Sequence, residues 1–221
     1  MKPIKELIQK IKSDKWISEG KMKTIESELT NEMKFAFVEI ANELCPGFEI
    51  RNELKQNLND LCLYFLGIKG ELSLDKGICL TGEYGTGKST LMKIFQRWLA
   101  VCWPFNGNGF TITSIEEIIE YYKKDGNLYR FTFNRDQDGF PDVHHILINE
   151  FGKDLKDKIY GTEAIQILNS LMMIRYDIFQ NSGKVTHITS NMLPISEDKA
   201  LNDRYIEMFN VVKINGKSYR K

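Results

Sequence analysis

The sequence predicts an α/β fold, in which a parallel sheet is flanked by helices and a small helical region precedes it. Two observations carry this prediction. From residue 76 onward, short apolar stretches alternate with longer amphipathic ones, which is the pattern of strands joined by helices. A glycine-rich loop separates the first apolar stretch from the first amphipathic one. The chain has 221 residues, 42% of them hydrophobic, which is enough for one such core.

Residues 1–70 are predicted to be helical. Apolar residues recur at spacings of three and four in residues 4–17, 31–44 and 52–67, which places them on one face of each helix. Pro46 and Gly47 end the second of these helices. This region either docks a partner protein or packs on the core formed by residues 71–221, and the sequence does not choose between these alternatives.

The core is predicted from its apolar and amphipathic stretches in turn. We expect strands at residues 77–81, 110–114, 144–149, 184–191 and 210–214, and helices at residues 88–103, 114–126, 162–183 and 196–209. Ser114 and Glu117 have capping-box spacing at the start of the second helix, and Gly126 ends it. We expect Thr162 to cap the third helix. Asn215 and Gly216 are typical of a hairpin turn near the C-terminus.

The stretch "GEYGTGKS" matches the pattern of a phosphate-binding loop between a strand and a helix. Backbone N–H groups of such a loop, at a helix N-terminus, form a cradle for anions. Lys88 is expected to reach the β- and γ-phosphates of ATP, and Ser89 to offer its hydroxyl to Mg²⁺. The predicted nucleotide contacts from this segment are Gly82, Glu83, Tyr84, Gly85, Thr86, Gly87, Lys88, Ser89 and Thr90.

The stretch "ILINEFG" supplies the predicted acidic site at the end of a strand. Glu150 can accept a proton from the attacking water. Asn149 stands where an ATPase would carry a metal-holding aspartate, and its amide offers Mg²⁺, through water, an oxygen without negative charge. Three alternatives remain: slow hydrolysis, a nucleotide switch without useful turnover, or an engineered change that traps ATP. We favour impaired hydrolysis over its loss.

Together with "ITSN" and "ALNDRYIEMFNVVKINGKSYR", these motifs resemble the DnaC/IstB group of AAA+ P-loop ATPases, in the same order and at similar spacing. This group comprises helicase loaders and ATP-dependent helpers of transposases. The resemblance covers about residues 76–221 and implies an AAA+ core. It also implies no helical C-terminal lid, which members of this group often lack.

The resemblance assigns roles to three more residues. Asn191 matches the sensor-1 asparagine, which positions water or senses the γ-phosphate. Arg204 matches an arginine that reaches the ATP of a neighbouring subunit, and this implies a homo-oligomer. Arg220 matches the sensor-2-like arginine near the C-terminus. With Lys88 and Glu150, Asn191 and Arg204 form the predicted catalytic set.

Residues 120–135 interleave aromatic and basic side chains, a composition that suits single-stranded DNA. The candidate contacts are Lys123, Lys124, Tyr129 and Arg130. The alternative is a helix and hairpin whose aromatic side chains pack on the core.

The predicted function is that of an ATP-binding accessory factor for DNA replication, most like a helicase loader with a replicative helicase as partner. A transposition helper that recruits a transposase and a non-hydrolysing adaptor are the alternatives, and a small-molecule kinase is weaker. The formal net charge is zero, so the composition alone does not indicate nucleic acid. With no apolar run of about 20 residues and no signal-like N-terminus, we expect a soluble, cytoplasmic protein without membrane contact.

Overall fold

The computed structural model describes residues 27–102, 107–133, 143–152, 158–159, 162–193, 199–216 and 218–219. The chain forms two compact units. The first consists of residues 1–74 and 90–109, and the second of residues 75–89 and 110–221. The helix predicted at residues 4–17 lies outside the described residues, and the predicted boundary at residue 70 stays a prediction.

Three helices and a short 3-10 turn make up the described part of the first unit: α2 (Ser27–Leu44), η1 (Asn52–Leu54), α3 (Lys55–Phe65) and most of α4 (Lys88–Cys102). Aromatic rings join the helices. Phe95 of α4 lies 4.7 Å from Phe37 of α2 and 4.6 Å from Phe65 of α3, between ring centroids. The Trp98 indole also donates a hydrogen bond to the Met33 carbonyl at 2.9 Å. These contacts give α4 one aromatic core with α2 and α3.

The second unit contains a five-stranded parallel sheet. Its strands are β1 (Gly77–Thr81), β2 (Phe110–Ser114), β3 (His145–Phe151), β6 (Thr186–Ser190) and β7 (Phe209–Lys213), in the spatial order β2-β3-β6-β1-β7. β6 therefore separates the strand that leads into the glycine-rich loop from the strand that carries Asn149 and Glu150. β4 (Lys158–Ile159) and β5 (Thr162–Glu163) form a separate antiparallel pair.

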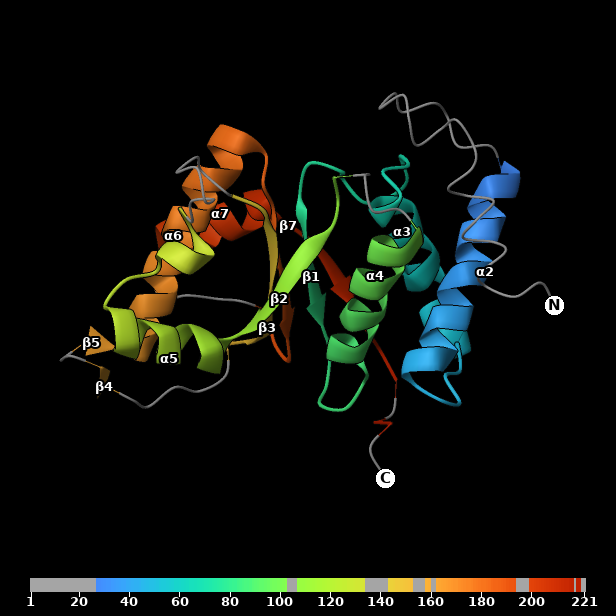
Figure 1. Cartoon of the computed structure of the whole chain (residues 1–221), viewed down its shortest axis with the longest axis horizontal. Helices are drawn as coiled ribbons and strands as arrows, with labels where there is room; N and C mark the ends of the chain where they lie inside the picture. Colours follow the sequence, from blue (N-terminus) through green and yellow to red (C-terminus); the bar gives the residue numbers. More distant parts are fainter. Residues whose placement is uncertain are drawn as a thin grey trace. The chain divides into compact units, whose positions relative to one another are not determined.

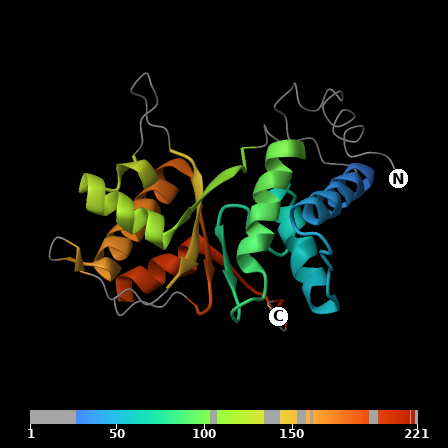
Figure 2. The same ribbon diagram turned by 60° about the horizontal axis from the view of Figure 1, so that its bottom comes forward.

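The helices of the second unit are α5 (Ile115–Asp125), α6 (Ala164–Ser182) and α7 (Lys199–Met208), with a short turn η2 (Tyr129–Phe131) after α5. The two views show these three helices together on one face of the sheet (Figures 1 and 2). Their apolar side chains share a core with β3 and β6, including Ile118, Ile148, Leu171, Ile188 and Tyr205. The parallel sheet with flanking helices confirms the predicted fold class.

The predicted ends of α5 are confirmed. The Ser114 hydroxyl accepts a hydrogen bond from the Glu117 amide at 3.1 Å, and Gly126 follows the helix with a left-handed φ of 68°. Two other expectations are wrong. Thr162 does not cap α6, because it pairs with Ile159 in the β4–β5 ladder and the helix begins at Ala164.

The hairpin predicted at residues 215–216 is the second expectation that is wrong. Ser218 and Tyr219 do not lie in a strand, and the Tyr219 amide instead donates a hydrogen bond to the Gly85 carbonyl at 2.9 Å. The turn signal depended on two neighbouring residues. The residues after it contact the glycine loop, which lies more than a hundred positions earlier in the chain.

Two buried polar side chains hold β6 in place. His187 accepts a hydrogen bond through Nδ1 from the Ile78 amide at 3.0 Å, and burial lowers the His187 pKa to about 3, so the ring is neutral. Arg175 of α6 is 1% exposed and donates to the Thr186 hydroxyl and the Val185 carbonyl at 2.9 and 3.1 Å. These bonds satisfy polar groups that burial would otherwise penalise. They anchor the strand whose far end reaches the candidate site.

None of the described helices is long and apolar enough to cross a lipid bilayer.

Candidate nucleotide site

The glycine loop, residues 82–87, connects β1 to α4. Gly82, Gly85 and Gly87 have φ values of 147°, 77° and 87°, which side chains with a Cβ rarely adopt. At Gly82 a Cβ atom would also collide with the Ile214 carbonyl. The positions where the motif places glycine are therefore those where the backbone requires it. The loop turns sharply and ends at the N-terminus of α4.

Lys88 is buried at the start of α4, and its ammonium group lies against the glycine loop. It donates hydrogen bonds to the Gly82 and Glu83 carbonyls at 2.7 and 2.8 Å. It also donates to the Asn191 side-chain oxygen at 3.1 Å. Lys88 and Asn191 are 103 positions apart in the sequence, and this bond joins the glycine loop to the end of β6.

The end of β3 departs from regular strand geometry at the acidic motif. Ile148 pairs with Ile188 of β6 and Phe151 pairs with Ser190, so β3 has one more residue than β6 between the two pairs. This is a β-bulge. Glu150 lies in it with a φ of 57°, a left-handed conformation that costs a residue with a Cβ free energy.

Thr189 of β6 holds both residues of the motif. Its hydroxyl donates a hydrogen bond to the Asn149 side-chain oxygen at 2.7 Å and accepts one from the Glu150 amide at 3.0 Å. Thr189 is buried, so these bonds are shielded from water. The bulge takes the Glu150 amide out of the regular strand ladder, and the threonine hydroxyl satisfies it instead.

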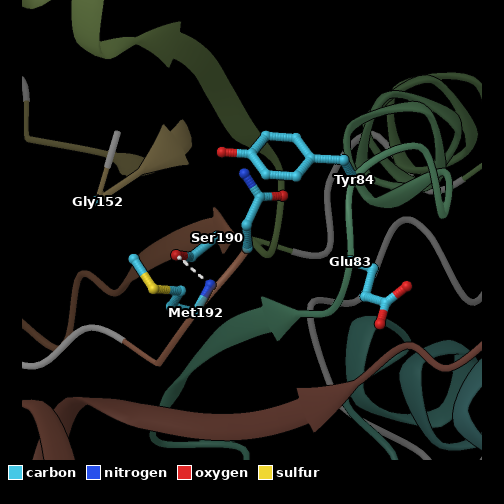
Figure 3. Close-up of a pocket in the computed structure, with 6 residues that line it drawn as sticks. Glu83, Tyr84, Gly152, Ser190 and Met192 are labelled. Carbon is cyan, nitrogen blue, oxygen red and sulfur yellow. Dashed lines mark hydrogen bonds between the residues drawn. The ribbon is translucent and has the colours of Figure 1, made fainter. Parts of the chain in front are cut away.

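A cavity of about 410 Å³ opens between the glycine loop and the ends of β3 and β6. It is lined by Glu83, Tyr84, Gly152, Ser190, Asn191 and Met192. Figure 3 shows that the Glu83 carboxylate and the Tyr84 ring project from the loop in different directions, and that the Ser190 hydroxyl accepts a hydrogen bond from the Met192 amide at 3.2 Å. The cavity lies at the carboxyl ends of parallel strands, where open α/β sheets bind ligands.

The residues of the glycine loop fit a phosphate group. The Lys88 ammonium supplies positive charge, and the N-terminus of α4 directs backbone N–H groups to the same place. A magnesium ion fits less well. Ser89 stands in the first turn of α4 with a hydroxyl to offer, but the Asn149 oxygen is neutral and already accepts the Thr189 hydroxyl.

The predicted catalytic arginine, Arg204, lies on α7 and is not one of the six residues that line the cavity; Lys88 and Glu150 are not among them either. The Arg204 guanidinium is 5.0 Å from the centroid of the Tyr176 ring on α6 and contacts the Met173 sulfur. The Tyr176 hydroxyl donates a hydrogen bond to Glu207 at 2.6 Å. Arg204 is therefore held in a defined place by contacts with α6.

Two other predicted nucleotide contacts are not placed at the cavity. Thr90 is exposed on α4, and Arg220 lies outside the described residues.

The predicted single-stranded DNA segment consists of the end of α5 and the turn η2. Tyr121 and Phe131 pack with the core, and the Arg130 guanidinium pairs with Glu117 at 3.1 Å. Lys123 pairs with Glu120 at 2.8 Å. Lys124 is exposed, and Tyr129 is 63% exposed. Tyr121 and Phe131 are thus used within the fold, whereas the basic side chains and Tyr129 remain at least partly exposed, and DNA binding stays a prediction.

The sequence interpretation missed several residues of the site. In the sequence, Thr189 is part of the "ITSN" stretch, from which only Asn191 was assigned a role. The role of Thr189 depends on a bulge in another strand. Gly152 and Met192 line the cavity, and Tyr219 contacts the glycine loop from the end of the chain. A glycine directly after "NEF" was a usable signal for Gly152. The contact of Tyr219 had no local signal.

Comparisons with known proteins agree with this architecture. No protein-family model and no curated protein matches the chain. The crystal structure of the DnaC helicase loader matches with a TM-score of 0.53 and 14% identity, covering 78% of this chain and 96% of that one. Domain III of the Thermotoga maritima replication initiation protein DnaA matches with a TM-score of 0.54 and 16% identity, covering 80% of this chain and 67% of that one. At these identities the likeness shows the fold alone: the chain shares the α/β fold of these two proteins, in agreement with the predicted fold class.

Proposed function

We propose that this chain is an ATP-binding accessory factor of DNA replication, of the helicase-loader type, which hydrolyses ATP slowly. The observation that carries the proposal is the hydrogen bond between Lys88 and Asn191. It brings the predicted phosphate-binding lysine and the predicted γ-phosphate sensor to one place. The DnaC helicase loader and domain III of the replication initiation protein DnaA have the same fold, and this likeness supports the assignment to replication.

The residues of the site divide the chemistry among them. Lys88 would neutralise charge on the β- and γ-phosphates. Glu150 would accept a proton from the attacking water, and Asn191 would hold that water or the γ-phosphate in line. Ser89 would hold Mg²⁺ through its hydroxyl, and the ion would supply positive charge that offsets the charge of the phosphates. Asn149 contributes no charge to that ion. We therefore infer that the chain binds ATP but hydrolyses it slowly.

The test compares wild type with Lys88→Ala and Asn149→Asp. We expect wild type to bind ATP and release phosphate slowly, and Lys88→Ala to lose binding. Asn149→Asp should raise turnover about tenfold or more, because a carboxylate holds Mg²⁺ far better than an amide. The measurements are calorimetry with ATP and phosphate release at saturating Mg²⁺. Turnover of the wild type as fast as that of Asn149→Asp would contradict the slow-hydrolysis proposal.

The proposal includes assembly and DNA binding. Arg204 would complete the nucleotide site of a neighbouring copy, so that ATP promotes a homo-oligomer. Lys124, Tyr129 and Arg130 are exposed and Lys123 is partly exposed, and these four side chains are the proposed contacts to single-stranded DNA. The helicase partner follows from the loader assignment alone. A transposition helper and a nucleotide-switch adaptor share the ATP site, and phosphate release stimulated by single-stranded DNA would count against the adaptor.

A further inference from the structure

We propose that the C-terminal tail, the described residues 214–216 and 218–219, holds the glycine loop in the shape that binds phosphate, and that Tyr219 is the positioning residue. This inference rests on the proposed nucleotide site for its functional consequence. Its structural basis is a set of contacts at both ends of the loop.

The first contact lies where β1 passes into the loop. The Ile214 amide donates a hydrogen bond to the Thr81 carbonyl at 2.7 Å, which continues the pairing of β7 with β1 by one step. The Ile214 carbonyl then lies so close to Gly82 that a Cβ atom there would collide with it. The tail therefore fixes the point at which the loop leaves the sheet.

The second contact lies at the far side of the loop. The Tyr219 amide donates a hydrogen bond to the Gly85 carbonyl at 2.9 Å. The Tyr219 ring lies beside Gly87, with ring carbons 3.6 Å from the position a Cβ atom would take. Lys88 directly follows this glycine. Tyr219 therefore contacts Gly85 and Gly87, the last two glycines before the phosphate-binding lysine.

The glycines of the loop explain why a contact from the tail would matter for phosphate binding. A loop with three glycines at positive φ has much conformational freedom, and that freedom must be lost before its N–H groups converge on an anion. A contact that restricts the loop beforehand reduces this cost and raises affinity without touching the ligand. Tyr219 keeps 45% of its surface exposed, so its ring contributes less to the core than a buried aromatic would.

The test uses Tyr219→Phe, Tyr219→Ala and Tyr219→Pro. Phe keeps the ring and the amide, Ala removes the ring, and Pro removes both the ring and the N–H donor. We measure hydrogen exchange of the glycine loop without nucleotide. We expect the Tyr219→Phe variant to exchange at the wild-type rate, the Tyr219→Ala variant to exchange faster, and the Tyr219→Pro variant to exchange fastest. Affinity for inorganic tripolyphosphate and for ATP should fall together, about tenfold in Ala and further in Pro.

The control is Phe35→Ala, an aromatic of similar exposure (41%) on α2, which should leave loop exchange and both affinities unchanged. Unchanged exchange in Tyr219→Ala and Tyr219→Pro would overturn the inference. A loss of affinity for ATP but not for tripolyphosphate would also overturn it, because the ring would then serve the nucleoside. Hydrogen exchange could follow the expected order although the chain binds neither tripolyphosphate nor ATP. That result would support the contact between the tail and the loop and would reject the proposed nucleotide site.

Discussion

At the scale of single residues, the acidic motif depends on a hydroxyl group in another strand. Thr189 donates to the Asn149 side chain and accepts from the Glu150 amide, which places both residues. Glu150 is the one described residue other than glycine with a positive φ, and its conformation persists because the surroundings hold it. The predicted general base is therefore positioned through its backbone.

We expect Thr189→Val to lower ATP turnover at least tenfold while changing ATP affinity little, because the geometry of Glu150 is lost and the Lys88 site remains. The variant would also lose the hydrogen bonds of the Thr189 hydroxyl to Asn149 and Glu150, which together cost about 1–3 kcal/mol of stability. Steady-state kcat and KM with a urea unfolding curve provide the measurement. Thr189→Ser keeps the hydroxyl and should restore turnover. If Val turned over like wild type, Thr189 would have no positioning role.

At the scale of elements, α5 and the turn after it show how far a basic, aromatic segment is used within the fold itself. Its first turn is capped by Ser114, and its inner face packs in the core through Ile118 and Ile119. Arg130, which follows the helix, lies 5.8 Å from the centroid of the Tyr121 ring and is paired with Glu117. The isoleucines are engaged within the core, whereas Arg130 stays exposed despite its ion pair, so any contact with DNA would fall to Arg130 and the other exposed side chains.

If this segment binds single-stranded DNA, Lys124→Ala should weaken binding more than Lys123→Ala does, because Lys123 is already paired with Glu120. Tyr129→Ala should remove one stacked base, at about 1–3 kcal/mol. Fluorescence anisotropy with a labelled oligonucleotide at several salt concentrations measures both, and loss of a phosphate contact lowers the salt dependence by about one unit of slope. Equal affinities of wild type and the Lys124→Ala, Tyr129→Ala double variant would remove the segment from the proposed DNA interface.

At the scale of the whole molecule, the predicted catalytic residues come from separate elements: Lys88 begins α4, Glu150 lies in β3, Asn191 follows β6, and Arg204 lies on α7. The guanidinium stacks on Tyr176, on the surface of α6 and α7. We propose that this arginine acts on the nucleotide of another copy of the chain. The proposed assembly rests on the family resemblance, which assigns that role to Arg204.

We expect ATP to raise the mass of the protein in analytical ultracentrifugation. Arg204→Ala should keep ATP affinity but lose turnover, by roughly a thousandfold if the arginine acts as a finger. Mixing Arg204→Ala with Lys88→Ala should restore part of the activity, because each supplies what the other lacks. A monomer at every ATP concentration, or a mixture no more active than its components, would contradict action between subunits.

Several features followed from local sequence. The alternation of apolar and amphipathic stretches predicts β1, α4, β2 and α5 because periodicity and capping act over a few residues. The glycine loop was predictable in the same way, since its backbone turns require glycine at particular positions. The acidic motif was found because it directly follows an apolar strand.

Tertiary structure decided what depends on groups far apart in the chain. The bulge at Glu150 and its bond to Thr189 exist because β6 lies between β1 and β3, and no local pattern specifies that order. α4 shares its aromatic core with α2 and α3, although the sequence divides them at the strand β1. Tyr219 meets Gly85 across 134 positions, so the turn signal beside it predicted the wrong partner. Sequence by itself determined which chemical groups the site has, and long-range packing decided which of them hold the others in place.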